Sequence, residues 1–181
     1  MTIHKIYNSD AEVAPTRAPN LWSVSNCFDP TTYEWLSKLY LDHDELWHRH
    51  QDCLEYRIQL EPRSKSFNRM NSLCAEMTGE MEKITGRKLA PAESKVWIDL
   101  PYFHCPYHSD AGLLLVTYQV YLWQYGGHVP GTTFCHVDPS IEVPFQANAG
   151  YINLNEDLKV HHVPRSEGIR LSACFQWRAE V

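Results

Sequence analysis

The second half of the chain is a succession of short runs rich in β-branched and aromatic residues, and this pattern limits its fold more than any other feature. Turns with proline or glycine, such as 126-GGHVPG-131 and 164-PRSEG-168, separate the runs. Closely spaced strands of this kind are typical of a jelly-roll sandwich. The expected strands are 96–100, 116–123, 132–137, 141–145, 149–154, 158–163 and 169–177.

Two helices are expected ahead of these strands. Asp29 and Pro30 are typical of an N-cap and of the first residue of a helix. A second helix from about Ser66 to Thr85 has one apolar stripe and ends at Gly86. The expected fold is mostly β (α+β), a double-stranded β-helix or jelly roll with two N-terminal helices packed on one sheet. Short strands are also expected at 21–26 and 54–60.

A length of 181 residues suits a single domain. Residues 1–20 are polar and are expected to form a flexible leader. The domain is then expected over residues 21–181, with helical support at about 28–90 and the jelly-roll core at about 95–178.

Composition argues against several classes of protein. The net charge is −6 and no run of lysine or arginine occurs, which disfavours a protein held to nucleic acid by phosphate contacts. No window approaches the apolar length of a membrane span, and the N-terminus lacks the apolar stretch of a secretory signal. The six cysteines have no repeated short spacing, so we expect reduced thiols in a cytosolic protein.

The last expected strand has one apolar and one polar face. If the polar face is directed into the sandwich, Arg170 lies in the interior. An ordinary core does not tolerate an arginine there unless an anionic group pairs with it. The apolar face holds Ile169, Leu171, Ala173, Phe175 and Trp177, and the polar face holds Arg170, Ser172, Cys174 and Gln176.

Two histidine-rich stretches, 104-HCPYHSDAG-112 and 161-HHVP-164, suggest a metal site. His108 and Asp110 are two residues apart, so an extended chain places both side chains on one face. The third ligand must come from the second stretch, in which His161 and His162 point to opposite faces and only one can coordinate. Two imidazoles and one carboxylate on one side of an ion form the facial arrangement of non-haem Fe(II) oxygenases.

Several motif elements then follow one another in order: His108-x-Asp110, His161 in a His-x-Val context, and Arg170 nine residues later. With them, residues 96–177 resemble the catalytic core of the 2-oxoglutarate- and Fe(II)-dependent dioxygenases, particularly the compact prolyl-hydroxylase-like branch. The resemblance makes 21–181 an oxygenase domain. It assigns the two histidines and the aspartate to Fe(II), with His161 preferred over its neighbour.

The resemblance also implies a cosubstrate site. Arg170 and Ser172 match the family's Arg-x-Ser pattern, in which both residues hold the far carboxylate of 2-oxoglutarate. Tyr121 is the candidate third contact, and Gln119 shares its face. The open metal positions would take the 2-oxo acid group and molecular oxygen. The implied reaction is hydroxylation of an unactivated C–H bond, with release of succinate and CO2.

Other functions remain open at this point. A cupin-type metal-binding jelly roll would lack 2-oxoglutarate chemistry, and a binding module could carry a degenerate site. Cys105 and His108 have a zinc-like spacing, but no second cysteine pair completes the site. Another His-x-Asp, residues 50–52, is interpreted as solvated surface. A peptidyl side chain such as proline is placed slightly ahead of a small metabolite as substrate, and nucleic acid is disfavoured.

Overall fold

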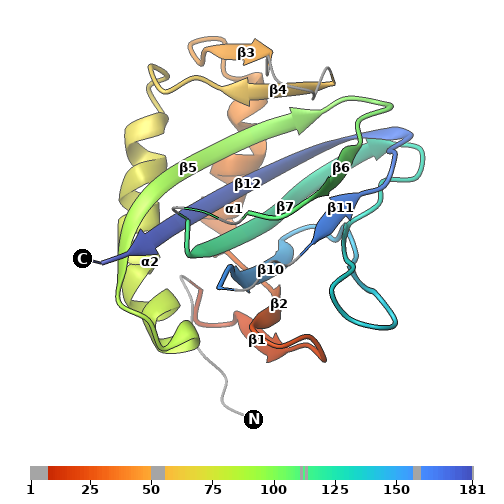
Figure 1. Cartoon of the computed structure of the whole chain (residues 1–181). Coiled ribbons are helices and arrows are strands. Elements are labelled where there is room, and N and C mark those ends of the chain that lie inside the picture. The colour runs from red at the N-terminus through yellow and green to blue at the C-terminus, as the bar shows by residue number, and fades with distance from the viewer. Residues whose placement is uncertain (1–7, 50–55, 111, 113, 157–159, 181) are drawn as a thin grey trace.

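The computed structural model describes residues 8–49, 56–110, 112, 114–156 and 160–180, so the His-x-Asp at residues 50–52 lies outside them. In this part of the chain, an 8-stranded and a 4-stranded sheet form two layers, and every pairing is antiparallel (Figure 1). The fold is mostly β with two helices, as the sequence predicts.

The strand order of each sheet is as follows. The large sheet contains, from edge to edge, β1 (Glu12–Pro15), β2 (Leu21–Ser25), β10 (Ala149–Leu154), β7 (Val116–Gly126), β12 (Gly168–Ala179), β5 (Leu89–Asp99), β4 (Arg57–Leu60) and β3 (Trp47–Arg49). The small sheet contains β6 (Cys105–His108), β11 (His161–Val163), β8 (Thr132–Phe134) and β9 (Ile141–Val143).

The first helix begins, and the second ends, at the residues that the sequence indicates. The Asp29 carboxylate accepts hydrogen bonds from the first backbone N–H groups of α1 (Pro30–Lys38), which the short 3-10 turn η1 (Leu39–Leu41) follows. The second helix, α2 (Phe67–Thr85), ends at Gly86, whose φ of 68° is left-handed and therefore suits glycine. Neither helix of the described chain is long and apolar enough to cross a membrane.

Both helices contact the large sheet on the side away from β6 and β11 (Figure 1). Trp123 on β7 donates its indole N–H to the carbonyl of Ser37 in α1, at 3.0 Å. Trp177 on β12 donates to the hydroxyl of Thr78 in α2, also at 3.0 Å. Trp177 is fully buried and Trp123 partly buried, and both indole N–H groups are satisfied.

The two faces of β12 differ as predicted. Its apolar face, from Leu171 to Trp177, packs against the buried methionines of α2 in the main hydrophobic core. Its polar face carries Arg170, Cys174 and Gln176 to the wall of a cavity between the two sheets. One strand therefore divides the packed core from the space that is available to ligands.

Three strands, β1, β3 and β6, are not predicted by the sequence pattern. β1 lies within the segment expected to be a flexible leader, and it pairs with β2 along its whole length. Ala11 and Val13 are 1% and 4% exposed, so this segment contributes to the core from residue 11 onward. β6 is too short, and too interrupted by Pro106, to give an alternating pattern.

Candidate metal centre and cosubstrate pocket

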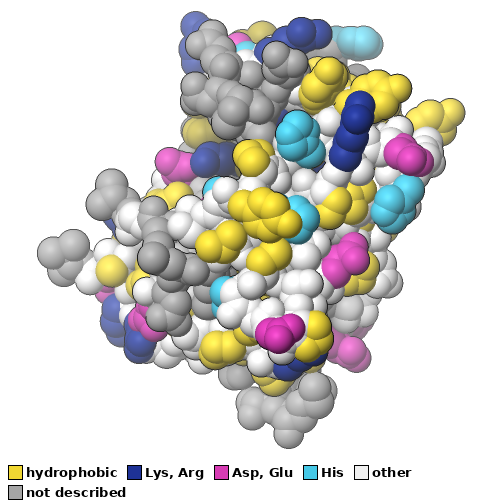
Figure 2. Space-filling view, turned by 45° about the vertical axis from the view of Figure 1, so that its right-hand side comes forward, with side chains coloured by type: hydrophobic (Ala, Val, Ile, Leu, Met, Phe, Trp, Pro, Cys, Tyr) yellow, Lys and Arg dark blue, Asp and Glu magenta, His cyan; other side chains and the backbone are white. Residues whose placement is uncertain are grey.

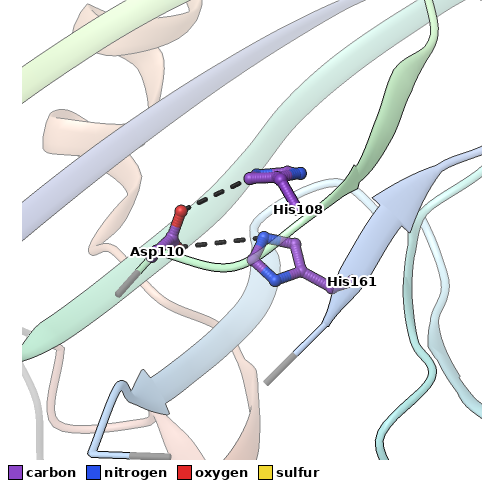
Figure 3. Close-up of side chains that lie close together, drawn as sticks. All are labelled: His108, Asp110 and His161. Carbon is purple, nitrogen blue, oxygen red and sulfur yellow. Dashed lines mark ion pairs between the residues drawn. The ribbon is translucent and has the colours of Figure 1, made fainter. Parts of the chain in front are cut away.

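Three side chains from neighbouring elements of the small sheet converge on one point (Figure 3). His108 ends β6 and His161 begins β11, and these two residues face each other across the antiparallel pair. Asp110 follows β6 directly. His108 Nε2 lies 3.7 Å from Asp110 Oδ1, and His161 Nε2 lies 3.8 Å from Asp110 Oδ2.

This separation suits a shared metal ion. One donor atom from each of the three residues lies within 4.8 Å of the other two. Ligand atoms sit at about 2.0–2.2 Å from a first-row metal, so small side-chain rotations bring all three onto one ion. Among the described residues, the group of potential ligands comprises these three, and Cys105 is not part of it. The geometry therefore does not support a structural zinc site.

Neighbouring groups hold His108 in a ligand orientation. Its Nδ1 lies 2.9 Å from the carbonyl of Pro106, which can only accept, so Nδ1 carries the proton and Nε2 faces Asp110. A hydrogen bond with the Cys105 thiol raises the pKa of His108 to about 9, against the effect of burial, which lowers it.

The carboxylate of Asp110 is also oriented. Thr117 donates its hydroxyl hydrogen to Asp110 Oδ2 at 3.3 Å. The same hydroxyl oxygen accepts from the amides of Asn155 at 3.1 Å and Gln176 at 3.4 Å. Thr117 has a single hydroxyl proton, and the two amide donors leave that proton directed at Asp110.

The two adjacent histidines point to opposite faces of β11. His161 is 4% exposed, and its ring lies 4.2 Å from that of His108. His162 stacks on Tyr107 at 4.3 Å between ring centroids, on the outer face of the small sheet. Figure 2 shows this outer side, where hydrophobic and histidine side chains lie close together. The structure thus places His161, and not His162, beside the other two candidate ligands.

The three side chains open into a cavity of about 340 Å³ between the sheets. Arg170, Tyr121 and Gln119, each considered for the cosubstrate on sequence grounds, all line this cavity. The Tyr121 hydroxyl donates to Thr132 at 2.9 Å, and burial raises the pKa of Tyr121, which keeps its hydroxyl protonated. A neutral donor and a guanidinium therefore share the wall of one pocket.

Arg170 and Ser172 project from the same face of β12. Arg170 is 3% exposed, and it donates from Nε to Asp99 at 2.6 Å and from Nη1 to the carbonyl of Pro130 at 3.1 Å. Nη2 has no acceptor among the described residues, so the guanidinium retains unused donors. The buried Ser172 hydroxyl likewise makes no hydrogen bond with the described residues. Arg170 lines the cavity and could meet a bound carboxylate there, whereas Ser172 is not among the residues that line it.

No protein-family model and no curated protein sequence matches the chain. Solved structures do match. HygX from Streptomyces hygroscopicus, solved with nickel and 2-oxoglutarate, has a TM-score of 0.67 at 12% identity, over 92% of this chain and 88% of that one. A 2OG-Fe(II) oxygenase family oxidoreductase from Burkholderia pseudomallei has a TM-score of 0.64 at 14% identity, over 93% and 84%. The fold is that of the 2-oxoglutarate- and Fe(II)-dependent oxygenases.

A third similar structure is a prolyl-4-hydroxylase from Pseudomonas putida, with a TM-score of 0.64 at 13% identity, over 90% of this chain and 94% of that one. This oxygenase fold agrees with the resemblance found in the sequence. At such low identity the matches establish the fold alone. The assignment of individual residues rests on the contacts within the cavity.

Sequence reasoning missed several residues of the site. Thr117 gave no signal, because a threonine in a strand is ordinary. Asp99 gave a weak signal as the single acid in the apolar run 96-VWIDL-100. A buried carboxylate requires a partner, and in the structure Asp99 contacts both Arg170 and Arg57 of β4.

Proposed function

We propose that this protein is a 2-oxoglutarate- and Fe(II)-dependent dioxygenase, a double-stranded β-helix enzyme that hydroxylates its substrate with release of succinate and CO2. One observation carries the proposal. His108, Asp110 and His161 converge beside a cavity whose wall also contains the buried guanidinium of Arg170. A cupin-type metal site would account for the three ligands but gives no reason for the arginine.

The donor set fits the metal. Two imidazoles and one carboxylate are ligands that Fe(II) accepts, and on one side of the ion they leave positions for other molecules. When bound, Fe(II) would supply the redox chemistry that couples dioxygen to oxidation of the substrate. The chain itself would orient the ligands, through the Pro106 carbonyl for His108 and the Thr117 hydroxyl for Asp110.

The cosubstrate fits the remaining groups. Arg170 and Ser172 would hold the far carboxylate of 2-oxoglutarate, with Tyr121 as a candidate third contact. Charge-assisted hydrogen bonds to a carboxylate are among the strongest that a protein makes. They would also satisfy the buried Ser172 hydroxyl, which otherwise has no partner among the described residues.

The proposed function predicts a spectroscopic signature. Adding Fe(II) and 2-oxoglutarate to the purified protein without oxygen should produce the weak visible charge-transfer band of the chelated 2-oxo acid. Glutarate is the matched control, because it has both carboxylates but no 2-oxo group, and it should give no band. Metal binding without a band on addition of 2-oxoglutarate would support the cupin-type alternative and contradict the proposal.

For the prime substrate we propose a peptidyl side chain such as proline, with a small metabolite as the second candidate. A cavity of about 340 Å³ that also holds the cosubstrate has space for one side chain or one small molecule. The net charge of −6 disfavours nucleic acid.

The substrate proposal is tested by succinate release. Proline-containing peptides, free amino acids and methylated oligonucleotides are offered in parallel, with 2-oxoglutarate and Fe(II) in excess. We expect the peptides to stimulate succinate release above the substrate-free rate. Stimulation by the oligonucleotides alone would overturn this ranking.

A further inference from the structure

Two arginines share one buried carboxylate at the wall of the cavity. Asp99 ends β5 and lies opposite Arg57 of β4 on one side and Arg170 of β12 on the other. Arg57 binds it with both Nε, at 2.6 Å from Oδ1, and Nη2, at 3.0 Å from Oδ2. Arg170 Nε lies 2.6 Å from Oδ2. The three side chains thus form one continuous cluster across three neighbouring strands.

The charges of this cluster do not balance. It has two guanidinium groups and one carboxylate, and within the described chain no other carboxylate forms an ion pair with either arginine. The side chains are 11%, 0% and 3% exposed for Arg57, Asp99 and Arg170, so water screens them little. A buried charge without a partner is costly. The cluster therefore carries one positive charge that an anion in the cavity could neutralise.

The position of the cluster shows where that anion would lie. Arg57 and Arg170 line the cavity, whereas Asp99 is fully buried and does not. The Arg57 guanidinium is enclosed by two aromatic rings, 4.1 Å from the Trp97 centroid and 4.4 Å from that of Phe103. These rings hold the Arg57 guanidinium in place by cation–π contact. The positive side of the cluster thus faces the cavity and its negative side faces the core.

We propose that Arg57 is a positioning residue that sets the charge of the cosubstrate site by neutralising Asp99. The bidentate pair of Arg57 and Asp99 leaves the charge of Arg170 available for the far carboxylate of 2-oxoglutarate. Without Arg57, Asp99 would neutralise Arg170 through the bond that already joins them. The site would then bind a carboxylate weakly although Arg170 is unchanged. This inference rests on the proposed function.

A charge-rescue experiment tests this role. Binding of 2-oxoglutarate to the Fe(II)-loaded protein is measured by calorimetry without oxygen. The Arg57→Met variant should bind about 10- to 100-fold more weakly, as for the loss of a charge-assisted contact. The double variant Arg57→Met/Asp99→Asn should regain most of the affinity, because Arg170 is again unopposed. Glutarate should follow the same order, since it has the carboxylates but no 2-oxo group.

A matched control separates charge from packing. Arg69 on α2 also stacks on a tryptophan, 3.8 Å from the Trp35 ring centroid, but it does not line the cavity. The Arg69→Met variant should bind 2-oxoglutarate as the wild type does. Thermal melting of each variant shows whether it is folded. If the Arg57→Met variant is not folded, Asp99→Asn alone serves as the test. This substitution removes the negative charge of the cluster, so the variant should bind 2-oxoglutarate at least as tightly as the wild type.

The possible outcomes are distinct. Wild-type affinity in Arg57→Met, equal weakness of the single and double variants, or weaker binding by Asp99→Asn would each refute the role of Arg57. If the wild-type protein itself bound no 2-oxoglutarate, the proposed function would fail instead.

Discussion

Replacing His161 by alanine is expected to abolish metal-dependent turnover, whereas His162→Ala should keep most of it. His161 is buried, and its Nε2 lies 3.8 Å from Asp110, so its loss removes one of three ligands. His162 stacks on Tyr107 on the outer face and directs nothing toward the metal site. The two variants remove the same side chain from consecutive positions and therefore control for each other.

The measurements are Fe(II) affinity by anaerobic titration and succinate release with excess 2-oxoglutarate. Removing one of three ligands should lower both strongly, and melting curves should show that both variants are folded. The opposite result is loss of iron binding in His162→Ala and its retention in His161→Ala. That result would show that His162, and not His161, is the metal ligand.

The alternation of apolar and polar residues along the last strand, β12, was the sequence pattern that predicted the fold best. Its alternation reported two different environments, because the helices cover one face of β12 and the cavity lies on the other. Three short strands, β1, β3 and β6, escaped prediction. β1 and β6 each have four residues that include a proline, and their pairing is determined by neighbours distant in sequence.

The candidate ligands were predictable because their chemistry is local. His108 and Asp110 are two residues apart, and His161 has its own motif context. The supporting groups come from other strands: Thr117 of β7 contacts Asp110, while Asp99 of β5 and Arg57 of β4 contact each other beside Arg170. Their roles depend on the register between strands, which the spacing of residues along the chain does not determine.

Replacing Arg170 by leucine is expected to raise the 2-oxoglutarate requirement while iron binding stays nearly intact. A charged contact to a carboxylate in a sheltered site contributes about 2–4 kcal/mol, which is a factor of tens to hundreds in affinity. Iron binding should persist because the guanidinium contacts Asp99 and Pro130, and none of the three candidate ligands. The concentration of 2-oxoglutarate at half-maximal succinate release and the Fe(II) affinity are measured together.

Arg170→Lys is the informative companion, because it keeps the charge but loses the planar set of donors. In the wild type, Nε is held by Asp99 and Nη1 by the Pro130 carbonyl, which leaves Nη2 for the ligand. A lysine ammonium cannot occupy these positions at once, so we expect an intermediate requirement for 2-oxoglutarate. If the leucine variant needed no more 2-oxoglutarate than the wild type, the cosubstrate site would have to lie elsewhere in the cavity. Equal loss in the lysine and leucine variants would show that the geometry of the guanidinium, more than its charge, holds the carboxylate.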